Sequence, residues 1–106
     1  MSKVINVHAL ERLIGPKWSV ETIDALAHGP RRWTELVQRL TAASGEVVHN
    51  KSLNSALRHL QERRIVDHTS DHHGPVYRLT HHGHDLNRLL DQMHGWAERH
   101  RDTLDL

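Results

Sequence analysis

The sequence predicts a mainly helical α+β fold in one domain of 106 residues. Three observations predict it. Apolar residues recur at helical spacing in five separate segments, which favours five helices. Two short segments between residues 65 and 79 lie on either side of a turn, which is typical of a β-hairpin. Glycine–proline pairs and single glycines separate these segments, as expected at element boundaries.

The first half of the chain contains three predicted helices. Leu10 and Leu13 lie on the apolar side of the first helix, and the second ends at Gly29, where a capping glycine is followed by a proline. Thr34 is the predicted N-cap of the third helix. The helices are predicted over residues 4–14, 17–27 and 34–40, with a short edge strand at 31–33 and a polar loop at 41–48.

The second half contains one helix on each side of the hairpin. Leu53, Leu57 and Leu60 form the buried stripe of the first. Thr80 is the predicted N-cap of the second, whose apolar stripe continues to about Arg101. The predicted ranges are 50–63 for the first helix, 65–70 and 76–79 for the strands, 71–74 for the turn and 82–101 for the last helix.

This order of elements predicts a winged helix-turn-helix with a two-stranded wing and extra helices at both ends. Within the single domain of residues 1–106, the helix-turn-helix spans about 34–63, the wing about 65–80 and a C-terminal dimerisation helix about 82–101. A small domain buries a modest share of its surface, and the terminal helices carry more apolar residues than such a core can use. We therefore expect a homodimer formed through Leu10, Leu86, Leu89, Leu90, Met93 and Trp96.

Composition excludes several classes of protein. The chain has no cysteine, which excludes disulfides, thiolate metal sites and a cysteine nucleophile or redox switch. It has no apolar run long enough to span a bilayer and no apolar stretch of a signal peptide at its start. We therefore expect a cytoplasmic protein with no membrane partner. No nucleotide-binding glycine loop or recognisable nucleophile–base grouping occurs, so we expect neither enzyme activity nor a cofactor.

The predicted DNA-reading surface is the polar side of the helix at 50–63. Such a helix fits the major groove of B-DNA, and residues 31–80 hold eight arginines and lysines against five carboxylates. Short polar side chains would read bases, while cations on this helix, before the third helix and on the wing would hold phosphates. The alternative for each residue is an ordinary solvated surface. The candidate DNA-binding residues are Arg31, Arg32, Asn50, Lys51, Asn54, Ser55, Arg58, His73 and Arg78.

Four motifs, taken together, resemble the HxlR-type transcriptional regulators. Leu13–Trp18 is similar to the family's L-I-G-G-K-W opening, and Gly29–Leu36 to its G-P-R-R-F-S-E-L. Leu53–Leu60 matches L-x-x-x-L-R-x-L, and Tyr77–Gly83 resembles Y-S-L-T-x-x-G. The resemblance runs from about residue 7 to residue 100. It implies a homodimer on a pseudo-palindromic double-stranded DNA operator, with two recognition helices in successive major grooves.

The sequence also departs from this family pattern. Members often carry a cysteine near the N-terminus, which in some of them senses electrophiles or oxidants, and this chain has none. Ala56 stands where an arginine is common, which predicts weakened or shifted DNA binding. Arg64 replaces the usual glycine before the first wing strand, and the loop at 41–48 is longer than usual.

Histidine is unusually frequent, at 12 of 106 residues. His81, His82 and His84 suggest a metal site, but zinc needs three or four converging ligands and adjacent side chains diverge, so we predict none. Histidine gains charge within the range from pH 5 to 8. We hypothesise that DNA affinity rises below pH 7 through the histidines expected around the DNA-reading surface, which are His49, His59, His72 and His73.

Two further alternatives stay open from the sequence. Aromatic side chains with a few polar neighbours suit a small-molecule effector, but in a chain without phenylalanine we favour the alternative that the tryptophans are core residues. The candidate effector pocket comprises Trp18, Trp96, His8 and Met93. The rival function is a winged-helix module for protein contact or ligand binding, with weak or no DNA binding.

Overall fold

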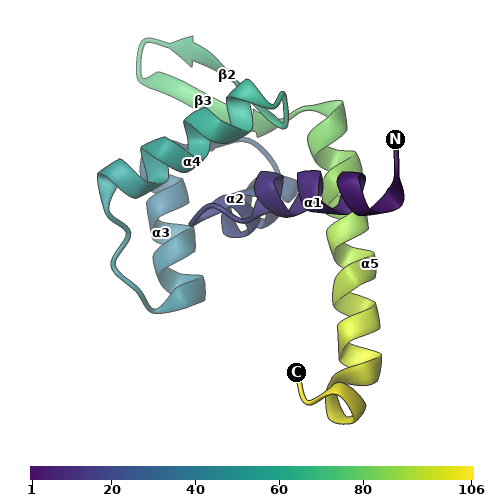
Figure 1. Ribbon diagram of the computed structural model, residues 1–106. Helices are drawn as coiled ribbons and strands as arrows, with labels where there is room; N and C mark the ends of the chain where they lie inside the picture. The colour runs from purple at the N-terminus through teal and green to yellow at the C-terminus, as the bar shows by residue number, and fades with distance from the viewer.

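The computed structural model describes residues 1–106, which form five helices and a three-stranded sheet (Figure 1). The predicted five helices, edge strand and hairpin are all confirmed. None of the helices is both long and apolar enough to span a bilayer. In chain order the elements are α1 (Lys3–Ile14), α2 (Ser19–Ala27), β1 (Arg31–Arg32), α3 (Trp33–Ser44), α4 (Asn50–Glu62), β2 (Val66–Asp71), β3 (Gly74–Leu79) and α5 (His81–Leu104).

The hydrophobic core lies between α2, α3, α4 and the base of the hairpin. Each of these helices buries one side, and α4 contributes the most buried apolar residues, four at helical spacing. Because one side of α4 is fixed in this way, its polar side must face outward. The most deeply buried aliphatic side chains are Ile23, Leu26, Leu36, Leu40, Leu53, Leu57, Leu60 and Val66.

The sheet has the strand order β1-β3-β2 and is antiparallel throughout. Strands β2 and β3 pair from Val66 opposite Leu79 to Asp71 opposite Gly74, which leaves His72 and His73 as the two-residue turn of the wing. Strand β1 is the edge strand and pairs with β3, with Arg31 opposite Tyr77. The start of the helix-turn-helix is therefore hydrogen-bonded to the wing.

Helix α3 corrects two sequence-based predictions. It begins at Trp33 with Arg32 as N-cap, rather than after a Thr34 cap, and the Glu35 carboxylate accepts the Arg32 backbone N–H at 2.9 Å. It also continues to Ser44, so the first half of the predicted loop at 41–48 is helix. Two alanines favour this last turn, and Gly45 ends it with a φ of 71° and an N–H bond to the Thr41 carbonyl.

The junction between α4, β2 and α5 depends on three residues. Arg64 has a φ of 61°, a left-handed conformation that favours glycine. The Thr80 hydroxyl donates to the Arg64 carbonyl at 2.6 Å and accepts the Gly83 N–H at 3.1 Å, so the predicted cap of α5 is confirmed. A Cβ at Gly83 would lie 2.3 Å from the Ile65 carbonyl oxygen, so only glycine permits this close approach of α5.

Arg64→Gly is expected to raise the free energy of unfolding by about 1 kcal/mol. Glycine removes the steric cost of the left-handed conformation, which exceeds the extra freedom that it gives the unfolded chain. Thermal unfolding followed by circular dichroism measures the change. Arg64→Ala is the matched control, because it removes the same side chain and keeps the strained backbone. An equal gain in both variants would assign the effect to the side chain instead.

Candidate nucleic-acid interface

The outward side of α4 carries five of the predicted DNA-binding residues. All five side chains are exposed, opposite the buried stripe of the same helix. The first turn of α4 has no acidic residue, and the His49 side chain forms no capping hydrogen bond, so the backbone N–H groups there stay available to an anion. The exposed residues are Asn50, Lys51, Asn54, Ser55 and Arg58.

Ala56 does not belong to this exposed side. It is 1% exposed and packs in the core, so an alanine here removes no cation from the outward surface. The family arginine could not occupy this position without displacing core side chains. The prediction that Ala56 weakens binding through this surface therefore loses its physical basis.

The two arginines before α3 are already engaged within the protein. Nε of Arg31 donates to the Ala25 carbonyl oxygen at 2.9 Å, which ties β1 to α2. The Arg32 guanidinium donates to both carboxylate oxygens of Asp71, at 3.1 and 2.7 Å, and so links β1 to the wing turn. Sequence reasoning did not identify Asp71, because nothing in a linear pattern shows that residues 32 and 71 lie together.

The Arg32–Asp71 pair stays ionised at neutral pH. The hydrogen bonds from Arg32, and next the N–H of His73 at 2.8 Å, lower the pKa of Asp71. The hydrogen bond to Asp71 in turn raises the pKa of Arg32. The Asp71 carboxylate therefore accepts a backbone N–H of the wing turn and joins that turn to β1. It also offsets the positive charge of Arg32 within the protein.

Arg78 is similarly occupied. Its Nη2 donates to the Thr69 hydroxyl at 2.9 Å, and its Nε lies 3.7 Å from a carboxylate oxygen of Asp67. The wing strands thus hold two carboxylates and one arginine, and the cation is paired. The wing therefore has no unpaired arginine or lysine, and its turn presents the exposed His73.

The histidines expected around the DNA-reading surface do not all lie there. Nε2 of His59 lies 2.8 Å from the Leu13 carbonyl oxygen, so this ring joins α4 to the end of α1. The rings of His72 and His73 contact each other at the wing turn in a tilted arrangement, with centroids 3.9 Å apart, and His49 is exposed before α4. The hypothesis of stronger DNA binding at low pH stays a prediction, with His59 removed from its set.

Asn54 has a partner that the sequence did not reveal. The indole Nε1 of Trp33 donates to its side-chain oxygen at 2.9 Å, which links the first residue of α3 to the exposed side of α4. The two residues are 21 positions apart, so the contact follows from helix packing rather than from any local motif.

The four residues of the predicted effector pocket are not brought together. Trp18 is 2% exposed and belongs to the core, as the alternative interpretation of the tryptophans expected. Trp96 and Met93 are exposed on α5, and Trp96 stacks on His100. His8 lies on α1, where its ring is 3.4 Å from the Glu11 carboxylate.

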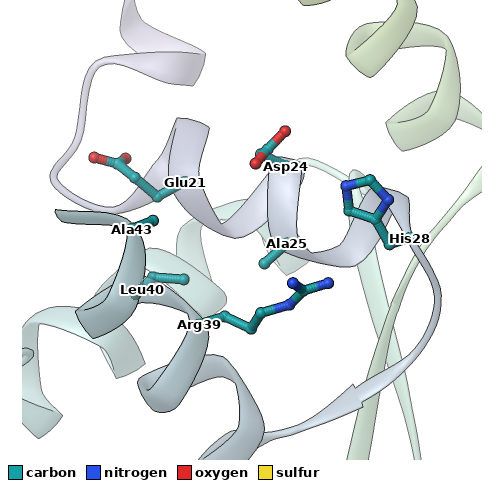
Figure 2. Close-up of a pocket in the computed structure, with 7 residues that line it drawn as sticks. All are labelled: Glu21, Asp24, Ala25, His28, Arg39, Leu40 and Ala43. Atoms are coloured by element: carbon teal, nitrogen blue, oxygen red, sulfur yellow. The ribbon is translucent and has the colours of Figure 1, made fainter.

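Cavities occur elsewhere on the surface. Figure 2 shows one of about 130 Å³ between α2 and α3, where Arg39 of α3 extends beside Ala25 and His28 of α2. This volume is below the range of about 300–1,000 Å³ that suits drug-sized ligands. A shallower groove of about 350 Å³ lies between α2 and α5 and is lined partly by Val20 and Leu90.

The predicted dimer surface is mostly uncovered in one protomer. Leu86 is the exception, because it is buried in the protomer's own core, and Leu90 packs partly against that core. Helix α1 buries none of its residues. In Figure 1, α5 extends far beyond the rest of the molecule. The exposed apolar residues on these two helices include Val4, Ile5, Val7, Leu10, Leu89, Met93 and Trp96.

Comparison with known families identifies this architecture. Residues 13–105 match the HxlR-like helix-turn-helix family. The chain belongs to that family. It is 28% identical over 90 residues to the HTH-type transcriptional regulator YodB of Bacillus subtilis strain 168, covering 82% of this chain and 76% of YodB. It is 27% identical over 99 residues to YtcD of the same strain, covering 91% and 75%.

Solved structures confirm the winged-helix fold. Quinone-bound YodB from B. subtilis superimposes with a TM-score of 0.73 at 26% identity, over 89% of this chain and 97% of that one. A MarR-family regulator from Enterococcus faecalis V583 gives a TM-score of 0.84 at 24% identity, over 100% and 96%. This HxlR-like chain is therefore a winged helix-turn-helix protein of a transcriptional-regulator family, and its relatives are regulators rather than enzymes.

Asp71→Asn is expected to loosen the wing. Asparagine can still accept the His73 N–H but cannot form the charged bidentate pair with Arg32. Amide hydrogen exchange at His73 and Gly74 should therefore become faster. Affinity for duplex DNA should fall several-fold, although charge alone predicts the opposite, because the substitution removes a negative charge near phosphates.

Asp67→Asn is the matched control for Asp71→Asn. It removes the same charge from the same wing but releases Arg78 instead of Arg32. Binding to DNA should be unchanged or tighter in this variant. Tighter DNA binding by both variants would show that Asp71 acts as a charge and does not position the wing.

Proposed function

We propose that this HxlR-like chain is a homodimeric regulator that binds a pseudo-palindromic double-stranded DNA operator sequence-specifically through α4. The observation that carries the proposal is the exposed polar side of α4, where Lys51 and Arg58 form no ion pair with any carboxylate. Free cations beside uncharged polar groups suit a surface that contacts both phosphates and base edges. Membership of a helix-turn-helix regulator family supports the same partner.

Within this proposal the residues have different roles. Asn50, Asn54, Ser55 and Arg58 read bases in the major groove, and Lys51 holds a phosphate near the N-terminus of α4. The remaining candidates contact DNA around these α4 residues. The wing turn, with its His73, lies along the DNA backbone. Arg32 and Arg78 are paired with carboxylates, and Arg31 donates to a backbone carbonyl. These three arginines therefore contribute to phosphate binding through their remaining N–H groups and by holding β1 and the wing in place.

The apolar surfaces of α1 and α5 support the homodimer. Met93 and Trp96 are about half exposed, and α1 has no buried residue of its own. Exposed apolar residues concentrated on two helices in this way favour an interface over a solvated surface. A dimer places two copies of α4 about one helical turn of DNA apart or slightly more, which suits half-sites with two-fold symmetry.

A small-molecule effector is a further part of the proposal. YodB has been crystallised with a bound quinone. This chain has no cysteine, so an effector here binds without forming a bond to a thiol. The α2–α5 groove is the better candidate, since it adjoins the helix that carries the dimer surface. A screen for compounds that release DNA tests it.

The rival function is a module for protein contact or ligand binding. The weak net charge of +1 favours it, as does the pairing of the wing cations. A salt series separates the two functions. Phosphate contacts predict an affinity that falls steeply with salt concentration, whereas a protein-contact module shows little DNA affinity at any salt concentration.

Arg58→Ala is expected to weaken binding to the specific site by about 1–3 kcal/mol if Arg58 reads a base. Fluorescence anisotropy with the protein's own upstream DNA and a scrambled duplex, at about 50 and 200 mM salt, measures both affinity and specificity. Arg39→Ala is the control, because it removes an equal charge from the α2–α3 pocket instead. Equal losses in the two variants would reduce the role of Arg58 to general charge.

Replacing Leu89 and Met93 together by glutamate is expected to produce a monomer. Charges on this exposed apolar surface would have to be desolvated in a dimer, while each side chain is already in contact with water in the protomer. Sedimentation velocity measures the mass. Val47→Glu is the control, since Val47 is a more exposed apolar residue outside α1 and α5. A dimer that survives the double substitution would place the interface elsewhere.

A further inference from the structure

The hydrogen bond between Trp33 and Asn54 determines which end of the Asn54 amide faces the protein. Nε1 of Trp33 lies 2.9 Å from Oδ1 of Asn54. An indole N–H only donates hydrogen bonds, so its partner must be the amide oxygen and not the NH₂ group. The ring of Trp33 is itself held in place, because the residue begins α3 and packs against the hydrophobic core.

Asn54 occupies the centre of the exposed side of α4. Asn50, Asn54 and Arg58 follow one another at four-residue spacing, which places them along one line of the helix. The Asn54 side chain is exposed, and its Nδ2 group donates no hydrogen bond within the protein. The NH₂ end of the amide is therefore the end available to a ligand.

We infer that Asn54 reads DNA as a hydrogen-bond donor and selects guanine over adenine at one position of each half-site. This inference rests on the proposed function. The usual pairing of asparagine with adenine needs both amide ends at the base, with the oxygen accepting from N6 and the NH₂ donating to N7. The hydrogen bond from Trp33 occupies one of the two lone pairs of the Asn54 oxygen and directs that oxygen toward α3, so the NH₂ group is the outward end of the amide.

Guanine is the base that suits the outward NH₂ group of Asn54. Its major-groove edge offers two neighbouring acceptors, N7 and O6, whereas adenine offers one acceptor beside an amino group. An amide that presents only N–H groups would face that amino group donor to donor. Trp33 is then a positioning residue that touches no base and acts through Asn54.

The test is selection of binding sites from a random duplex DNA library with four proteins, followed by competition measurements on the selected sites. The proteins are the unmodified chain, Asn54→Ala, Trp33→Phe and the double variant. The unmodified chain should prefer guanine by about tenfold at one position per half-site, and Asn54→Ala should lose that preference. Trp33→Phe frees the amide oxygen and should move the preference to adenine. The double variant should behave as Asn54→Ala.

Asn54→Asp keeps the test decisive if Trp33→Phe fails to fold. One carboxylate oxygen replaces the NH₂ group while the other still accepts from Trp33, so the preference should move to cytosine, whose N4 group donates. The inference is overturned if the unmodified chain prefers adenine at the Asn54-dependent position, if no position depends on Asn54, or if Trp33→Phe keeps the guanine preference. Absence of DNA binding at every salt concentration would instead overturn the proposed function, and this inference with it.

Discussion

Burial of the apolar stripe of α4 is the constraint on which the rest of the structure depends. Leu53, Leu57 and Leu60 are all at most 2% exposed, so the rotation of α4 about its axis is fixed by the core. A helix turned by 100° would expose a leucine and bury a charged side chain, and both changes are costly. The outward direction of Asn54 and Arg58 is thus a consequence of core packing.

The elements were predictable because each depends on local chemistry. The leucine spacing of α4, the Thr80 cap and the two-residue turn of the wing all act within a few positions. The site was predictable only in part, because its contacts join residues distant in sequence. The bonds from Trp33 to Asn54 and from Arg32 to Asp71 span 21 and 39 positions. Leu86 was assigned to the dimer because an apolar stripe does not distinguish a residue's own core from a partner.

The arginines and lysines near α4 and the wing fall into two groups, those paired with a carboxylate and those left unpaired. Lys51 and Arg58 have free charges on a rigid helix, while Arg32 and Arg78 have carboxylate neighbours and hold the wing. Exposed ion pairs contribute little to the free energy of folding. The larger effect of these two pairs is to fix the position of the wing strands and turn. A wing fixed to β1 is thereby tied to α3, which follows β1 directly in the chain.

Helix α1 connects stability to assembly. An isolated helix of 12 residues is marginal in water. Within the protomer, α1 has no fully buried residue, and only Leu13 and Ile14 at its end pack partly against the core. At the same end of α1, the carbonyl of Leu13 accepts from the ring of His59 on α4. Covering α1 by a second protomer would therefore order it and, through His59, act on the helix that carries Asn54 and Arg58. In the proposed dimer, assembly and recognition would be coupled through α4, because the side of α4 that contacts α1 and the side that faces outward belong to the same helix.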